Sequence, residues 1–352
     1  MSKKFPPGVA TGNLVMNIFK YAKKNCIAIP AINITGFNMI NAIIETAAEI
    51  NVPVIIQISN LGAAFNIGKG LNNKNQYSSI LGSIYTAKYI HQVSKAYRVT
   101  VILHTDHCNN EKILWIKKLL KENKKHFKLF NKTLFSSHML DFSNEPIKNN
   151  IKMCKYYFSL MNEMNMTLEV EIGITGGEEE GINNMKINYD KFYTKPKEVA
   201  YVYNNLKKIS SNFIIAATFG NVHGVYKSHF INLKPKILYK SQKYINKKFN
   251  IKQKKPVFFV FHGGSGSNLK KLKESIKYGV VKINLDTDMQ YYFTCGVRNY
   301  MEYKKKFLKN QIGNPKGKNK PNKKYYSPRI WLRKGEKEFK INLKKIFKKF
   351  KY

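Results

Sequence analysis

Short apolar runs recur eight times along the chain, each rich in β-branched or aromatic residues and bounded by polar or glycine-containing segments. Runs of about four to eight such residues predict buried β-strands rather than helices. The predicted strands cover residues 27–33, 53–59, 100–106, 133–140, 166–172, 213–220, 257–263 and 280–286.

Helical periodicity occupies most of the segments between these runs, at residues 38–50, 77–97, 147–164 and 197–210. Eight strands alternating with helices predict the α/β class and a single parallel (β/α)₈ barrel, a TIM barrel. A doubly wound sheet is the alternative. It normally has a glycine-rich fingerprint after its first strand, whereas residues 29–37 contain one glycine.

Polar side chains follow the predicted strands at, or just beyond, their C-terminal ends. In a barrel these ends lie together on the face that carries the active site. Ten positions fit this pattern: Asn33, Ser59, Asp106, His107, Asp141, Glu171, His223, His262, Asn284 and Asp286.

Histidines and carboxylates are prominent in this set. His107, His223 and His262 belong to different strand ends, and Glu171 follows a fourth. Any one of these histidines could be a hydrogen-bonded core residue. Because a barrel brings its strand ends together, we favour a set of ligands for zinc or a similar divalent metal, with one position left open.

Two further segments suggest binding of a charged substrate. The Gly-Ser loop at residues 262–267 and Thr287, beside a predicted helix start, resemble phosphate sites built from backbone N–H groups. The acidic, glycine-rich segment 173–184 follows Glu171. It is either a solvated loop or a carrier for a mobile base.

Composition and charge indicate where the protein is located and what it binds. The chain has 352 residues, of which 43% are hydrophobic, and no apolar run approaches the roughly 20 residues of a membrane span. An N-terminus without an apolar signal segment and four scattered cysteines predict a cytoplasmic protein with free thiols.

The formal charge of +41 makes nucleic acid a candidate partner, but the lysines are spread along the chain and no nucleic-acid motif accompanies them. We therefore expect no dedicated nucleic-acid or membrane partner.

Specific motifs extend over nearly the whole chain, including SNLGAAFNIGKG, VILHTDHC, EIGITGGEEEG, FGNVHGVY, FVFHGGSGS, VKINLDTD and PNKKYYSPRIWL. In these motifs the chain resembles class II, zinc-dependent fructose-bisphosphate aldolase, in its longer-chain subgroup. The resemblance implies reversible cleavage of fructose 1,6-bisphosphate to dihydroxyacetone phosphate and glyceraldehyde 3-phosphate, in glycolysis and gluconeogenesis. It also implies a homodimer, with a barrel at residues 1–309 and a basic extension at 310–352 that packs on the barrel and the dimer interface.

The resemblance assigns roles to individual residues. It implies that His107, His223 and His262 hold the zinc ion, with Glu171 as an alternative ligand, and we add Asp141 as a further candidate ligand. Three residues are implied in the chemistry: Asp106 in proton transfer at the carbon-4 hydroxyl, Glu179 in proton exchange on dihydroxyacetone phosphate, and Asn284 in stabilising the enediolate. Binding of the two phosphate groups falls to Gly224, Gly263, Ser265, Asp286 and Thr287, with Na⁺ or K⁺ nearby, and to Asn33, Ser59 and Arg329.

Three alternatives stay open from the sequence. Tagatose bisphosphate, which differs at carbon 4, could be the substrate of such an enzyme. A polyanion-binding protein could retain the barrel without catalysis. Lys282 could form a Schiff base, but strand alternation puts it two residues deeper than Asn284, where it is better placed to balance buried carboxylates.

Overall fold

A closed barrel of eight parallel strands forms the centre of the computed structural model, which describes residues 5–179, 182–183, 189–224 and 232–350, with backbone alone from 178 to 190. The sheet closes through the pairing of β4 with β5. Its strands are β2 (Ile29–Asn33), β3 (Val54–Ile58), β4 (Thr100–Thr105), β5 (Ser137–Leu140), β6 (Thr167–Ile172), β9 (Phe213–Ala217), β11 (Phe259–Phe261) and β12 (Val280–Leu285). All eight predicted strands are present, and the prediction of a single (β/α)₈ barrel is confirmed.

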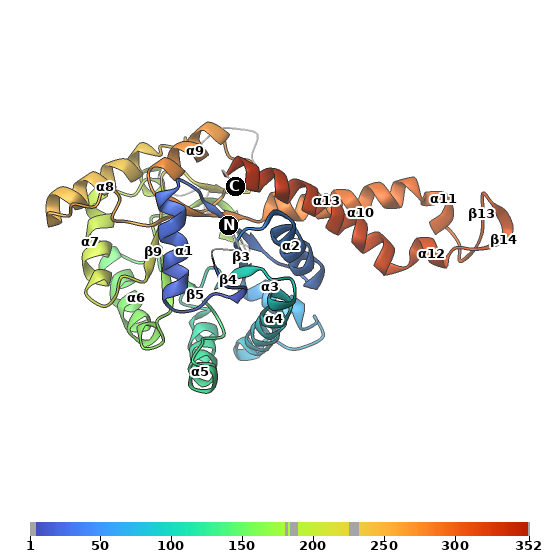
Figure 1. Cartoon of the computed structure of the whole chain (residues 1–352), viewed down its shortest axis with the longest axis horizontal. Helices are drawn as coiled ribbons and strands as arrows, with labels where there is room; N and C mark the ends of the chain where they lie inside the picture. The colour runs from blue at the N-terminus through green and yellow to red at the C-terminus, as the bar shows by residue number, and fades with distance from the viewer. Residues whose placement is uncertain (1–4, 180–181, 184–188, 225–231, 351–352) are drawn as a thin grey trace.

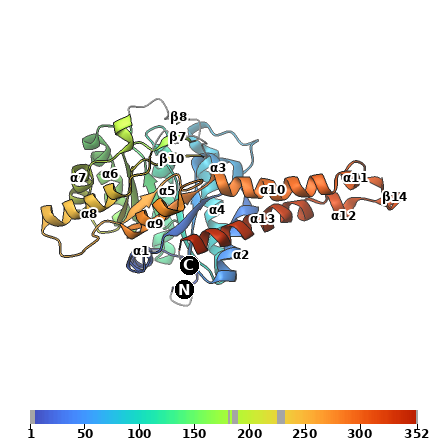
Figure 2. The ribbon, with the colours of Figure 1, turned by 90° about the horizontal axis from the view of Figure 1, so that it is seen from above.

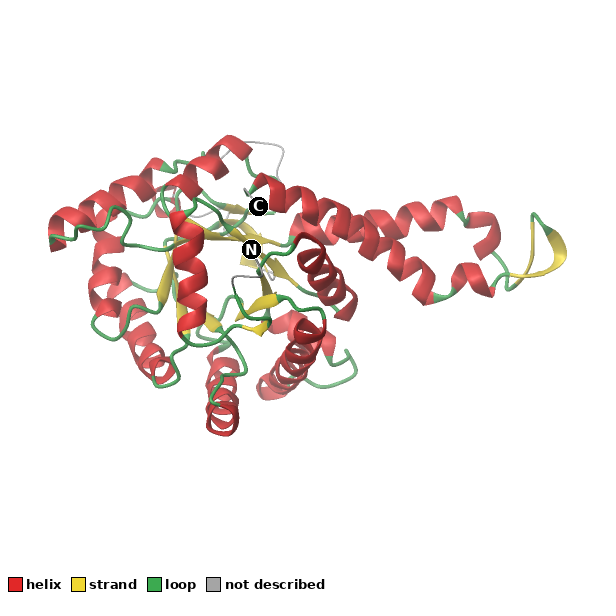
Figure 3. Ribbon diagram, in the orientation of Figure 1, coloured by secondary structure: helices red, strands yellow, loops and turns green. Residues whose placement is uncertain are grey.

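Helices surround the barrel and bury the outer faces of its strands (Figure 1, Figure 3). Because both faces are covered, the strands are almost continuously apolar, as parallel strands are. These helices are α2 (Phe37–Ile50), α3 (Asn60–Asn66), α4 (Tyr77–Ala96), α5 (Ile113–Phe130), α6 (Ile147–Asn162), α7 (Pro196–Lys207), α8 (Lys236–Phe249), α9 (Leu269–Lys277) and the first turns of α10 (Thr287–Tyr303).

The N-terminal end of the barrel is closed by helix α1 (Asn13–Lys24). Its apolar side chains, among them Met16 and Phe19, pack on residues near the starts of the strands, such as Ile29, Ile55 and Val281. Figure 2 shows α1 and both chain ends on one side of the molecule and three short strands on the other. The opposite, C-terminal end of the barrel is therefore the end left for a site.

Three short strands at that end were not predicted: β7 (Gly176–Glu179), β8 (Ile182–Asn183) and β10 (Val222–His223). Two to four residues, several of them glycine or charged, give no apolar alternation to detect. Gly177, with φ +88°, is required here because a Cβ atom would lie 2.2 Å from the carbonyl oxygen of His223. The small sheet thus brings the acidic segment beside His223.

A helical arm projects from the barrel (Figure 1). It is formed by α10 and α13 (Pro328–Lys349), joined through α11 (Lys305–Leu308), the hairpin β13 (Ile312–Asn314) and β14 (Gly317–Pro321), and α12 (Lys323–Tyr326). Gly296 and Gly335 let the long helices approach closely, since a Cβ on Gly296 would lie 2.4 Å from the carbonyl oxygen of Lys334. The predicted boundary at residues 309–310 falls within the arm, and the division into domains stays a prediction.

Among the described helices, none combines the length and the hydrophobicity needed to cross a membrane.

Candidate metal centre and active site

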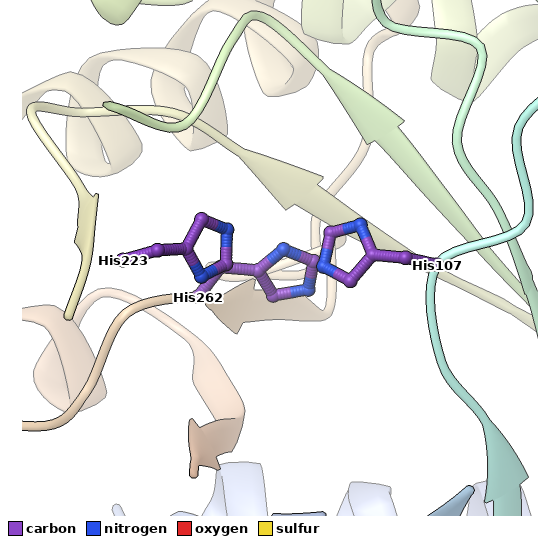
Figure 4. Close-up of side chains that lie close together, drawn as sticks. All are labelled: His107, His223 and His262. Carbon is purple, nitrogen blue, oxygen red and sulfur yellow. The ribbon is translucent and has the colours of Figure 1, made fainter. Parts of the chain in front are cut away.

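Three histidines converge at the C-terminal end of the barrel (Figure 4). His107 follows β4, His223 ends β10, and His262 follows β11. One ring nitrogen from each lies within 4.8 Å of the others, and the ring centroids of His107 and His262 are 4.9 Å apart. The structure therefore brings together the three imidazoles that the sequence predicted would meet.

Carboxylates complete a set of donors suited to a divalent metal. Asp141 and Glu171 form a second group with His107, again within 4.8 Å. Nδ1 of His262 and Oε2 of Glu171 are buried and have no hydrogen-bond partner among the described residues, although they lie 3.4 Å apart. A buried imidazole nitrogen and a buried carboxylate oxygen that face each other in this way fit zinc or a similar ion.

His107 is oriented by Asp141, which follows β5. Its Nδ1 lies 2.9 Å from Oδ2 of Asp141, whose other oxygen accepts hydrogen bonds from the backbone and hydroxyl of Ser143. Partial burial would raise the pKa of Asp141, but the contacts with His107 and Ser143 lower it to about 2. His107 has φ +32°, a conformation that is uncommon for residues other than glycine and that occurs often at functional sites.

His262 lies between two carboxylates. Nε2 is 2.9 Å from Oε1 of Glu169, on the side opposite the contact of Nδ1 with Glu171. Burial lowers the pKa of His262, but Glu171 and Glu169 together raise it to about 9. A metal ion at Nδ1 would take the place of the proton that Glu171 stabilises there.

Asp106 is buried between two side-chain amides. Asn33 Nδ2 donates to one carboxylate oxygen at 2.8 Å and Asn284 Nδ2 to the other at 3.4 Å. Gln57 in turn donates to Asn33 Oδ1 at 2.5 Å. Sequence reasoning missed Gln57, and the available signal was a polar residue in the middle of the otherwise apolar strand VIIQI.

Four of the residues predicted to bind phosphate lie just beyond the ends of β11 and β12. Gly263 and the buried Ser265 lie in the loop after His262, and Thr287 is the first residue of α10 with Asp286 before it. Two hydrogen bonds connect the loop with this helix start: Asp288 N donates to Ser265 Oγ, and Gly266 N donates to Asp288 Oδ2. Backbone N–H groups at a glycine loop and at a helix start are favourable for an anion. Gly224 follows His223 directly.

Three predicted residues stand apart from this group. Ser59 follows β3 and caps α3, its Oγ accepting a hydrogen bond from Gly62 N. Glu179 ends β7, and its side chain lies outside the described residues. Arg329 is the second residue of α13, which begins beside α12 in the outer part of the arm (Figure 1), and it lines a cavity with residues of the hairpin and of α12.

Lys282 is a buried partner of Glu169. Its Nζ lies 2.7 Å from Oε2 of Glu169, and the side chain is 1% exposed. A Schiff-base lysine must reach a substrate carbonyl as a free amine, so this ion pair argues against that role. Lys282 balances a buried carboxylate, as strand alternation indicated.

The chain is similar to known proteins over almost its full length. Residues 13–352 match the family described as fructose-bisphosphate aldolase class-II. The chain is 52% identical over 344 residues to fructose-bisphosphate aldolase class 2 of Buchnera aphidicola subsp. Schizaphis graminum, covering 97% of this chain and 96% of that protein. It is 49% identical over 351 residues to fructose-bisphosphate aldolase class 2 of Escherichia coli strain K12, covering 99% and 98%.

A solved structure agrees. The crystal structure of fructose-bisphosphate aldolase from Campylobacter jejuni superimposes with a TM-score of 0.90 at 46% identity, covering 98% of this chain and 96% of that one. The family match and the structural match therefore both agree with the candidate metal site formed by the three imidazoles. The chain belongs to the class-II fructose-bisphosphate aldolase family, whose members depend on a metal cofactor.

Proposed function

We propose that the protein catalyses the reversible cleavage of fructose 1,6-bisphosphate into dihydroxyacetone phosphate and glyceraldehyde 3-phosphate, as a step of glycolysis and gluconeogenesis. The observation that carries the proposal is the cluster of His107, His223 and His262 at the C-terminal end of the barrel, in a chain of this family. Cleavage breaks a carbon–carbon bond beside a ketone and leaves negative charge that the site must absorb.

The metal in this proposal is Zn²⁺, held by the three imidazoles with Glu171 able to replace one of them. When bound, zinc supplies a Lewis acid that polarises the ketone oxygen. Asp141 is the other candidate ligand. Its hydrogen bond to Nδ1 of His107 also suits it to orient that ring.

Asp106 accepts the proton of the carbon-4 hydroxyl as the bond breaks. Support comes from the two amide donors, each of which binds one oxygen of this carboxylate. In this proposal Asn284 donates to the enediolate oxygen, and its support is the hydrogen bond that brings it beside Asp106. Glu179 exchanges the proton on dihydroxyacetone phosphate, and the support for this role is its place at the end of β7, paired through that strand with the strand of His223.

The two phosphate groups of the substrate occupy opposite ends of the site. Gly224, Gly263, Ser265, Asp286 and Thr287 bind the first, with Na⁺ or K⁺ beside it. Asn33, Ser59 and Arg329 bind the second. Arg329 reaches the site of a partner subunit, because within its own chain it lies in the arm.

We also propose that the protein is a homodimer located in the cytoplasm. The arm carries several exposed apolar side chains, among them Tyr303 and Ile312, which are 79% and 62% exposed. Exposed apolar groups on a projecting element are typical of an interface. We expect no dedicated nucleic-acid or membrane partner.

Assay of fructose 1,6-bisphosphate cleavage with and without chelator tests the function. A chelator should abolish activity, and Zn²⁺ or Co²⁺ should restore it. Borohydride added with substrate should not inactivate, because Lys282 is engaged with Glu169. Activity that survives complete metal removal, or borohydride labelling of Lys282, would refute the proposal. Tagatose 1,6-bisphosphate in the same assay checks the substrate.

A further inference from the structure

A second group of ionisable side chains lies inside the barrel, one layer below the site. His104, Glu169 and Lys282 each lie on a barrel strand, two residues before a site residue on that strand or directly after it: Asp106, Glu171 and Asn284. Side chains on a strand alternate with a period of two, so the three point into the barrel directly beneath the chemistry. All three are no more than 1% exposed.

Glu169 connects this layer to the metal centre. Its Oε1 lies 2.9 Å from Nε2 of His262, and its Oε2 lies 2.7 Å from Nζ of Lys282 and 3.3 Å from Nε2 of His104. His104 is fixed in turn by Ser137, whose Oγ is 2.7 Å from Nδ1. Both oxygens of the carboxylate therefore have fixed partners from three other strands or strand ends.

The contact with Glu169 determines which nitrogen of His262 can bind a metal. An ionised carboxylate only accepts hydrogen bonds, so Nε2 of His262 must carry the proton. Nδ1, on the side of Glu171, is then the nitrogen with a lone pair for the ion. A carboxylate behind a ligating imidazole fixes the ring and makes it a stronger donor.

A purely structural role explains this group less well. Barrel interiors are normally filled by layers of apolar branched side chains, and a buried ion pair is often no more stable than apolar residues of similar volume. The charged layer instead contacts the metal centre through the hydrogen bond between Glu169 and His262. Lys282 supplies the positive charge that lets Glu169 stay ionised in the core.

We propose that Glu169 is a positioning residue that holds His262 with Nδ1 toward the metal, and that Lys282 acts through Glu169 as its buried counterion. The inference rests on the proposed metal-dependent function and deepens it. In this proposal Lys282 is not a nucleophile. The buried side chains beneath the site instead raise the affinity of the protein for the metal.

Metal affinity of the full-length apoprotein tests this directly, measured by competition of Zn²⁺ with a chromophoric chelator. Glu169→Gln keeps an acceptor oxygen but removes the charge, and the double variant Glu169→Gln/Lys282→Met also removes the lysine left without its partner. We expect the double variant to bind Zn²⁺ about 10- to 100-fold more weakly than wild type, the usual loss for such partners of a ligand. Its thermal unfolding as apoprotein should stay close to that of wild type.

Gln242→Met is the matched control. Gln242 is buried in α8 and makes three hydrogen bonds to backbone groups of Val257 and Tyr278, with none to the site. It should lower the unfolding temperature and leave Zn²⁺ affinity unchanged. Wild-type affinity in the double variant would overturn the proposal, since Glu169 and Lys282 would then serve stability alone.

A measurement on the wild-type protein covers the case in which the variants do not fold. With ¹⁵N-labelled histidine and bound Co²⁺, the ring N–H of His262 should be assigned to Nε2. A proton on Nδ1 with Nε2 bound to metal would overturn the proposal. Failure of the wild-type protein to bind metal at all would instead refute the proposed function, so the two failures are distinguishable.

Discussion

Asp106 shows how single side chains are prepared for chemistry at this site. It receives hydrogen bonds from the NH₂ groups of Asn33 and Asn284, and Gln57 holds Asn33 in place. An amide at position 106 would place an NH₂ group against one of these donors. Replacing Asp106 by Asn therefore removes the proton acceptor. It also disrupts part of the hydrogen-bond network that positions this side chain.

The two proposed acid–base residues should be separable by experiment. Asp106→Asn should lower the rate of carbon–carbon cleavage by roughly 10²-fold or more, the usual contribution of a positioned acid or base. Glu179→Gln should mainly slow tritium exchange between water and dihydroxyacetone phosphate, to a similar degree. Glu178→Gln is the matched control in the same strand. Unchanged exchange in Glu179→Gln would remove Glu179 from this role.

At the scale of elements, the contact between α2 and α13 is notable because acidic side chains, which are scarce in this chain, hold it through ion pairs. There are 62 Lys and Arg residues against 21 Asp and Glu, yet acidic side chains concentrate here. Arg333 contacts both oxygens of Glu45, at 2.9 and 2.7 Å, and Lys340 contacts Glu45 and Glu49 at 2.5 and 2.7 Å. This network fixes the C-terminal helix to the barrel.

Removing one charge should weaken that attachment. Glu45→Gln should lower the free energy of unfolding by about 1 kcal/mol near neutral pH, since Arg333 is partly exposed and the pair is screened. Glu163→Gln is the control: it removes an exposed pair with Lys124 and should cost less than about 0.5 kcal/mol. Denaturant titration measures both. Equal losses would show that the network adds nothing.

The pH dependence of this effect has a definite sign. Burial acts to raise the pKa of Glu45, but Arg333 and Lys340 lower it below its usual range. A carboxyl whose pKa is lowered by folding stabilises the protein above its unfolded pKa and loses that contribution as pH falls through the folded value. The difference between wild type and Glu45→Gln should be constant from pH 5 to 8, about the range above the unfolded pKa, and shrink below about pH 4.

For the whole molecule, the arm separates Arg329 from the site of its own chain. Arg329 lines a cavity of 640 Å³ between α12, α13 and the hairpin, together with several lysines and Tyr325. The cavity is basic, with four lysines and Arg329 among its lining residues. It suits phosphate recognition if a partner subunit brings its own site to the arm.

Shared sites predict complementation between two impaired variants. Arg329→Ala should raise the KM for fructose 1,6-bisphosphate far more than for fructose 1-phosphate, which lacks the second phosphate. In a heterodimer of Arg329→Ala and Asp106→Asn subunits, one of the two sites keeps both residues. An equal, re-equilibrated mixture should thus recover roughly a quarter of wild-type activity.

Arg298→Ala, an exposed arginine of α10, is the control and should leave both KM values unchanged. The mixture must be checked for subunit exchange by mass or by differential tagging. No recovery in a verified heterodimer, or full activity in a monomer at micromolar concentration, would mean that Arg329 does not serve a partner subunit.

The sequence by itself determined the barrel and the identity of its polar strand ends. Strands buried on both faces must be nearly continuous in apolar residues, so all eight are visible as local patterns. His107, His223 and His262 could be predicted because parallel strand ends in a barrel lie at one face. Lys282 could be placed below Asn284 by the two-residue period of a strand.

Only the tertiary structure decided the contacts between distant segments. Glu169 with His262, Asp141 with His107, and the approach of Gly296 to Gly335 each join residues whose pairing leaves no local pattern. The small sheet of β7, β8 and β10 likewise depends on backbone pairing across the chain, not on apolar alternation. Local propensity specifies elements, whereas hydrogen-bond partners and helix approach are determined by where closure of the barrel brings them.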